Sequence, residues 1–148
     1  MTLVMSDPEP QRVARRKFHR AVFIAAALYN IGWGLLTSLD PQWLFRLADM
    51  EPLRYPDVFA CVGMIVGLYG VVYFEVARRP ELSFVLAAVG LVGKILGPIG
   101  WFLAYSRGEW PGASIIVILT NDLIWWIPFG LYLYDAWPHF RRDLRRGW

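Results

Sequence analysis

The chain contains four apolar runs, each about the length needed to cross a bilayer. The runs cover residues 21–39, 58–77, 82–105 and 113–134. A membrane-spanning helix needs about 20 predominantly apolar residues, because the hydrocarbon core is about 30 Å thick. Lipid-embedded backbone must satisfy its own hydrogen bonds, and a helix does so within one segment. The sequence therefore predicts an all-α bundle of four transmembrane helices.

Composition supports a membrane protein and narrows its partners. The 148 residues are 57% hydrophobic, which is too apolar for a soluble domain of this size, and eight Trp suit membrane interfaces. The net charge of +3 is modest, so we expect the lipid bilayer as partner and no nucleic acid. Cys61 is the single cysteine, which excludes an intrachain disulfide. His19 and His139 lack neighbouring acidic ligands, so we expect no metal site.

The runs divide the chain into three parts. Residues 1–20 are predicted to form a disordered, basic N-terminal segment, residues 21–134 the transmembrane domain, and residues 135–148 a basic tail. The loop over residues 40–57 contains Asp40-Pro41 followed by apolar residues on one face. This pattern predicts a short interfacial helix in the first outer loop.

The distribution of Lys and Arg predicts the orientation in the membrane. Eleven lie in the N-terminal segment, the second turn and the C-terminal tail, and three lie in the first and third loops. Positively charged loops stay in the cytoplasm, so both termini are predicted to be cytoplasmic in a multi-pass protein. The size and simplicity of the chain favour a bacterial inner (plasma) membrane.

Glycines recur at helical spacing in the second and third spans. Gly63, Gly67 and Gly70 form one pattern, and the same spacing returns thirty residues later at residues 93, 97 and 100. Spacings of three and four place the glycines on one stripe of each helix. Small residues let transmembrane backbones approach closely. We therefore expect these two spans to pack as a tight hairpin.

Four polar residues lie halfway along three of the apolar runs: Asn30, Lys94, Asn121 and Asp122. An ionised side chain at the bilayer centre costs about 2.5–3.5 kcal/mol on insertion scales. Asp122 must therefore find a partner, stay protonated or face water. Lys94 is the cation at the same depth, and we expect the two side chains to meet inside the bundle.

Two prolines leave backbone carbonyl groups near this polar layer without their helical hydrogen bonds. Pro98 has no N–H, so the carbonyl of Lys94 loses its helical partner, and Pro128 does the same for Ile124. Each freed carbonyl needs a donor or water. We expect an asparagine amide or a tryptophan indole to supply it.

The polar layer has a structural and a functional interpretation. In the first, it only holds the helices together. In the second, it binds a small ligand through a set of seven residues: Asn30, Tyr69, Lys94, Asn121, Asp122, Trp125 and Trp126. Three forms of the second remain open: an anionic headgroup opposite Lys94, a proton relay through Asp122, or a quinone-like ring between the aromatic residues. Buried membrane charges favour function.

Two stretches carry a resemblance to known proteins. Gly93-Lys94-Ile95-Leu96-Gly97-Pro98 and Leu119-Thr120-Asn121-Asp122-Leu123-Ile124-Trp125-Trp126 resemble sequences in small four-span bacterial membrane proteins. Over residues 20–134 the plan is similar to the DoxX-like group. That resemblance implies a membrane subunit of an oxidoreductase system that passes electrons to quinone, and it assigns no catalytic residue.

The sequence thus predicts an integral membrane protein with a Lys-Asp-Asn site that binds a small ligand, a lipid headgroup or a quinone and is linked to a membrane redox system. Two other functions fit the same pattern: an accessory subunit of a larger membrane complex and a small homo-oligomeric transporter. No nucleophile or phosphate-binding motif identifies an enzyme.

Overall fold

The computed structural model describes residues 12–146, which form helices and contain no strand. Three long helices come first: α1 (Arg16–Leu39), α3 (Pro56–Arg78) and α4 (Phe84–Ser106). The short α2 (Trp43–Leu47) lies between α1 and α3. The fourth crossing is composite, with a 3₁₀ turn η1 (Gly112–Ser114), α5 (Ile115–Ile118), a π-helical turn η2 (Leu119–Leu123) and α6 (Ile124–Arg146).

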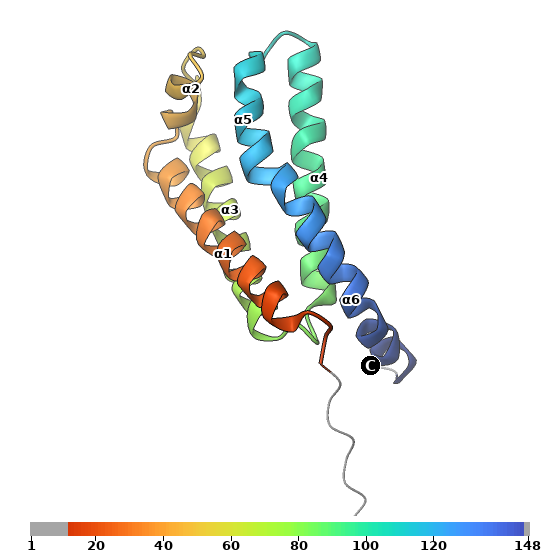
Figure 1. The fold of residues 1–148 in the computed structure, drawn as a ribbon. Helices are drawn as coiled ribbons and strands as arrows, with labels where there is room; N and C mark the ends of the chain where they lie inside the picture. Colours follow the sequence, from red (N-terminus) through yellow and green to blue (C-terminus); the bar gives the residue numbers. More distant parts are fainter. Residues whose placement is uncertain (1–11, 147–148) are drawn as a thin grey trace, which may run out of the picture.

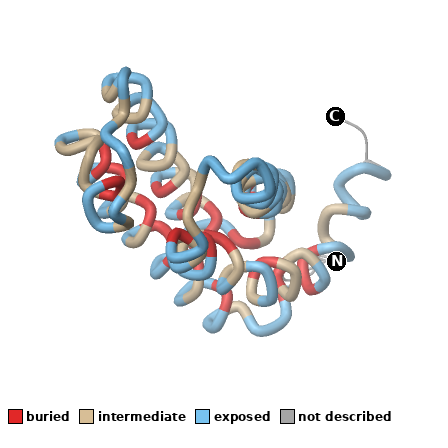
Figure 2. The backbone as a smooth tube through the Cα atoms, turned by 90° about the horizontal axis from the view of Figure 1, so that it is seen from above, coloured by how far each residue is buried: buried red, intermediate tan, exposed pale blue. Residues whose placement is uncertain are grey.

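Four helical segments in residues 12–146 are long and apolar enough to cross a membrane, which confirms the predicted all-α bundle of four spans. Only 17–33% of the most apolar stretch of each segment is buried. Apolar side chains therefore face mainly outward, as expected where lipid is the solvent. Figure 2 shows buried positions where helices adjoin and exposed positions around them.

The outer helices extend beyond the apolar runs that predicted them. α1 begins at Arg16 rather than at residue 21, and α6 continues through the basic region to Arg146. Arg and Lys are good helix formers, so the helices persist after the apolar sequence ends. The basic residues from 16 to 20 and from 135 to 146 are thus helical. The predicted disorder of residues 1–20 is therefore wrong for residues 16–20, and its part over residues 1–11 lies outside the described residues.

α1 and α3 form the most extensive helix pair in the described chain. A Cβ on Gly34 would lie 2.6 Å from the Cα of Gly67, so the backbones touch there. Gly63 and Gly70 also face α1, against Thr37 and Ile31 respectively. The predicted glycine hairpin between the second and third spans is therefore wrong. A glycine stripe shows which face of a helix another helix can approach closely, but it does not identify that helix. Here α1 has a glycine of its own, Gly34, opposite Gly67, and α1 is the helix that packs on the stripe.

The bundle consists of two helix pairs, α1 with α3 and α4 with the composite fourth crossing (Figure 1). Their terminal end carries the start of α1, the α3–α4 turn and the end of α6, and their loop end carries α2 and the α4–α5 turn. At the terminal end the pairs share an aromatic core of Phe23, Tyr73, Phe129 and Tyr132. At the loop end the rings of Phe45 and Trp110 meet with centroids 6.2 Å apart. The predicted polar layer lies between these two contacts.

The short helix of the first loop is present as α2 and packs onto the bundle. Leu44 and Phe45 are buried, and Trp43 Nε1 donates a hydrogen bond to Thr37 Oγ1 of α1 at 2.9 Å. The carboxylate of Asp40, just before this helix, accepts hydrogen bonds from Arg46 of α2, and no side chain caps the start of the helix.

Candidate functional site

Lys94 and Asp122 meet inside the bundle, as the sequence predicted. The Nζ of Lys94 lies 3.8 Å from Asp122 Oδ1, and the two side chains are 5% and 6% exposed. The pair joins α4 to the π-helical turn η2. A charge at this depth requires such a partner, because removing an unpaired ion from water is very unfavourable.

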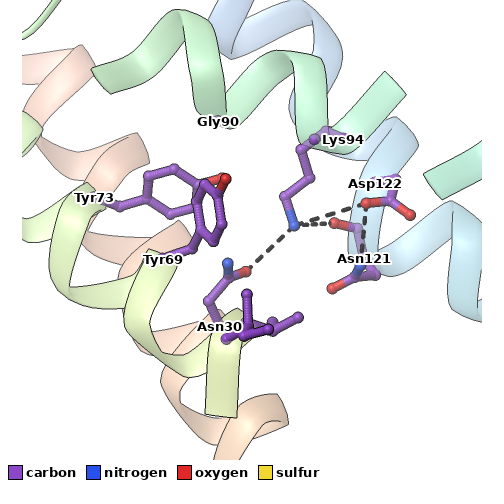
Figure 3. A pocket seen from close by; sticks show the side chains of 10 residues that line it. Asn30, Tyr69, Tyr73, Gly90, Lys94, Asn121 and Asp122 are labelled. Carbon is purple, nitrogen blue, oxygen red and sulfur yellow. Dashed lines mark hydrogen bonds and ion pairs between the residues drawn. The ribbon is translucent and has the colours of Figure 1, made fainter. Parts of the chain in front are cut away.

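The two predicted asparagines complete the layer. Lys94 Nζ donates hydrogen bonds to Asn30 Oδ1 at 3.3 Å and to the backbone oxygen of Asn121 at 2.5 Å. Asn121 Nδ2 donates to Asp122 Oδ1 at 3.1 Å. Figure 3 shows the four side chains converging from α1, α4 and η2. The amine thus joins both helix pairs.

Local backbone features let Asp122 and Asn121 reach Lys94. A π-helical turn contains one more residue than an α-helical turn, and such turns are frequent at functional sites. Both acceptors of the Lys94 amine on this helix lie within the turn. On the facing helix, a Cβ on Gly97 would lie 2.6 Å from Asp122 Oδ2. Only glycine at that position allows the carboxylate to approach α4 this closely.

The carbonyl that Pro98 frees is satisfied by a tryptophan, one of the two donors that the sequence suggested. Trp126 Nε1 donates to the backbone oxygen of Lys94 at 3.0 Å. α4 and the composite fourth crossing are therefore joined twice at the same residue, to η2 through the Lys94 amine and to α6 through its carbonyl. The second contact holds Lys94 in place without using its charge.

A cavity of about 140 Å³ lies beside this layer, between the two helix pairs. Its lining comes from α1, α3, α4 and η2: Asn30, Ile65, Val66, Tyr69, Tyr73, Gly90, Gly93, Lys94, Asn121 and Asp122. Five of the seven predicted ligand-binding residues are in this set. Trp125 and Trp126 are not, so the structure gives no support for a ring held between them. Trp125 packs against Tyr29 and Phe129.

Tyr73 is a site residue that sequence reasoning missed. Its ring is 1% exposed and stands beside Tyr69, with ring centroids 6.1 Å apart, on the wall of the cavity (Figure 3). Residues four apart share a helix face. Because Tyr73 follows Tyr69 by four residues on the same helix, the sequence contained the signal that identifies it.

Some buried polar atoms of the described chain have no hydrogen-bond partner, and one of them belongs to a residue that lines the cavity. Asn121 Oδ1 accepts no hydrogen bond within residues 12–146. A buried acceptor without a donor costs about 1–3 kcal/mol. The polar layer beside the cavity therefore has at least one buried acceptor that no described residue satisfies.

A second polar cluster, absent from the sequence interpretation, lies at the terminal end. Asp135 of α6 accepts hydrogen bonds from Arg15 Nε at 2.7 Å and Nη2 at 2.6 Å, and it lies 2.7 Å from His19 Nε2. The hydrogen bond to Asp135 raises the pKa of Arg15 above its usual value, so the guanidinium stays charged. The cluster fastens the start of α1 to α6. Sequence could place Asp135 opposite a basic segment but could not select its partners.

Comparison with known proteins gives two partial matches. Mouse Protein unc-93 homolog B1 is 30% identical over 116 residues, and its human counterpart is 29% identical over 119 residues. Each match covers 74% of this chain but 19% of the relative, so the chain spans about a fifth of the length of these curated relatives. No protein-family model matches the chain. No solved structure matches it.

Proposed function

We propose that this integral membrane protein binds a small ligand at mid-membrane depth, in the cavity beside Lys94 and Asp122. The observation that carries this function is the coincidence of the buried ion pair with a cavity lined by both its members. Interhelical polar contacts in membranes contribute only about 0.6 kcal/mol on average. Two buried charges are therefore a poor device for packing alone and a good one for a binding site.

The size of the cavity fits a ring or a small headgroup. An apolar cavity of about 150 Å³ in another protein holds one benzene molecule. The present cavity, at about 140 Å³, is thus large enough for one six-membered ring. A quinone ring and a compact lipid headgroup both meet that limit. The resemblance to the DoxX-like group supports the quinone and a link to a membrane redox system.

The proposed setting is a bacterial inner membrane with both termini in the cytoplasm. The asymmetry of Lys and Arg supports this orientation. In that orientation the terminal end of the bundle, with Arg15 and Asp135, faces the cytoplasm. The loop end, with α2, then faces the opposite side.

A second function, an accessory subunit that packs against a larger membrane complex, is favoured by the outer surface of α4. A Cβ on Gly100 would meet nothing within 4 Å, and Leu96, Ile99 and Leu103 are each at least half exposed. A helix of a partner protein could approach such a surface closely. The two functions are compatible. Both the surface and the cavity use α4, but they involve different residues of that helix.

A matched pair of substitutions on α4 tests ligand binding. Gly93 lines the cavity and Gly100 does not, and a Cβ on either meets nothing within 4 Å. Gly93→Leu should fill the cavity while leaving the polar contacts intact. Gly100→Leu adds the same side chain two turns away.

The readout is differential mass spectrometry of what co-purifies with each protein in mild detergent. We expect one small molecule with the parent and with Gly100→Leu, and at least about tenfold less with Gly93→Leu, as for any ligand that loses its space. Equal recovery from both variants, each folded, would contradict binding in the cavity. Loss only with Gly100→Leu would favour the partner-helix function.

A further inference from the structure

The Lys94 amine is engaged mainly by the protein, through two hydrogen bonds and one ion pair. An ammonium group has three N–H donors. The acceptors around Lys94 Nζ are Asn30 Oδ1 at 3.3 Å, the Asn121 backbone oxygen at 2.5 Å and Asp122 Oδ1 at 3.8 Å. All three belong to the protein. Two of its three donors are thus taken by hydrogen bonds and the Asp122 carboxylate lies nearest the third, so the amine offers a ligand at most one donor.

The charge of the lining is already balanced. Lys94 and Asp122 are the charged residues among those that line the cavity, and they carry opposite signs. An anionic ligand would bring an uncompensated negative charge to mid-membrane depth, where it is strongly disfavoured. This argues against the anionic headgroup that Lys94 alone suggested. The lining favours a neutral ligand.

One polar atom of the lining is fully buried without a hydrogen-bond partner, and it is an acceptor. Asn121 Nδ2 donates to Asp122 Oδ1 at 3.1 Å, and this contact fixes which end of the carboxamide is oxygen. The oxygen, Oδ1, is then left buried without a partner among residues 12–146. Figure 3 shows it on the side of the carboxamide away from Asp122. A ligand that satisfies this oxygen must donate an O–H or N–H group.

The rest of the wall favours a ring. Tyr69 and Tyr73 present aromatic rings, and Ile65 and Val66 add apolar surface from the same helix. A cavity of about 140 Å³ has room for one six-membered ring. Aromatic rings pack favourably edge to face or offset against other rings.

We propose that the cavity binds a neutral six-membered ring carrying a hydroxyl group, which donates its hydrogen bond to Asn121 Oδ1. This chemistry deepens the proposed function and rests on it, since it requires that the cavity hold a ligand. Phenols and hydroxylated headgroup rings of lipids share this chemistry.

Three small fluorinated probes test the donor requirement on the unmodified protein in lipid nanodiscs. 4-Fluorophenol is neutral and donates, 4-fluoroanisole is neutral and cannot donate, and 4-fluorobenzoate is an anion. Fluorine NMR line broadening measures binding, with empty nanodiscs as the reference for partition into lipid. We expect 4-fluorophenol to bind at least about tenfold more tightly than 4-fluoroanisole, the difference that one hydrogen bond to a buried acceptor makes.

Variants then assign the effect to the cavity. Gly93→Leu should abolish binding of 4-fluorophenol, Gly100→Leu should leave it unchanged, and Asn121→Leu should reduce the preference over 4-fluoroanisole to near unity. Equal binding of phenol and anisole, or tighter binding of benzoate, would overturn the donor inference and leave the cavity as a binding site. Binding of neither neutral ring, or binding that Gly93→Leu does not alter, would contradict the proposed function itself.

Discussion

The interface between α1 and α3 and the polar layer between the two helix pairs join helices by opposite chemistry. In the first, Gly34 and Gly67 bring two backbones into contact without charged groups. In the second, Lys94 bridges three elements through hydrogen bonds and an ion pair beside a cavity. The first interface is closed and extensive, whereas the polar layer of the second lies beside a cavity. We infer that the first supplies most of the stability and that the second carries the ligand chemistry.

The physics of lipid explains this division. Lipid chains are as apolar as leucine, so helices associate through close packing rather than through a hydrophobic drive. Glycine contacts along α1 and α3 provide such packing over several turns. A polar layer contributes little net stability, because its desolvation offsets its attraction. Its presence between the pairs therefore needs a reason other than stability.

The largest effect is expected when one charge of the polar layer is removed. Lys94→Met leaves Asp122 buried without its cation, and we expect a loss of about 3 kcal/mol in the free energy of unfolding. Lys94→Met combined with Asp122→Asn removes both charges and should recover most of that loss. Unfolding in mixtures of mild detergent and dodecyl sulfate, followed by circular dichroism, measures all three proteins.

The same variants separate packing from binding. A double variant that folds like the parent but no longer retains the co-purifying molecule would support a binding role for the pair. If the double variant retained that molecule at the parental level, Lys94 and Asp122 would be structural only. A double variant less stable than Lys94→Met alone would refute the pairwise coupling.

A smaller effect is expected at the α1–α3 interface. Gly34→Ala would place a Cβ 2.6 Å from Gly67 backbone atoms, which cannot move independently of the helix. The helices must separate, and overpacking of this kind costs about 1–3 kcal/mol. Gly32→Ala is the matched control, because a Cβ there meets nothing within 4 Å. The control should be neutral or slightly stabilising, since alanine is a better helix former than glycine.

Unfolding transitions of the two alanine variants, measured under the same conditions, decide whether this interface supplies the stability. If Gly34→Ala were as stable as Gly32→Ala, close packing of α1 on α3 would not be the main stabilising contact. Ligand retention should be equal in both variants, because neither residue lines the cavity.

Particular residues show why sequence predicted some of these contacts and not others. Lys94 and Asp122 could be paired in advance, because two opposite charges at one depth have few alternatives. Gly63, Gly67 and Gly70 could not be assigned a partner in the same way. Spacing shows which face of a helix is small, but the choice between α1 and α4 depends on the complementary shape of the partner. The partner proved to be α1.

Features that depend on backbone register were beyond the sequence. The π-helical turn η2 changes which side chains of the fourth crossing face inward. No residue pattern in Leu119–Leu123 predicts this turn. Trp126 consequently faces the Lys94 carbonyl instead of the cavity. At the terminal end, Asp135 could be matched to any of several basic residues across more than a hundred positions. Only the three-dimensional arrangement selects Arg15 and His19.

The smallest expected effect sharpens the role of Trp126, the contact that joins α6 to α4 without charge. Trp126→Phe removes the hydrogen bond to the Lys94 carbonyl and should cost about 0.5–1 kcal/mol of unfolding free energy. The carbonyl lacks a helical donor because residue 98 is proline. Pro98→Ala restores a backbone N–H at that position. Trp126→Phe should then cost clearly less in the Pro98→Ala background than in the parent.

That coupling distinguishes a hydrogen bond from simple packing. Phenylalanine keeps most of the ring contact but has no N–H, so a loss that persists undiminished with Pro98→Ala would come from packing. A loss that disappears with Pro98→Ala would show that the indole replaces the donor that proline removes. In that case Pro98 and Trp126 act together to position Lys94, and the polar interface owes its geometry to a missing backbone hydrogen bond rather than to close contact of the kind that joins α1 to α3.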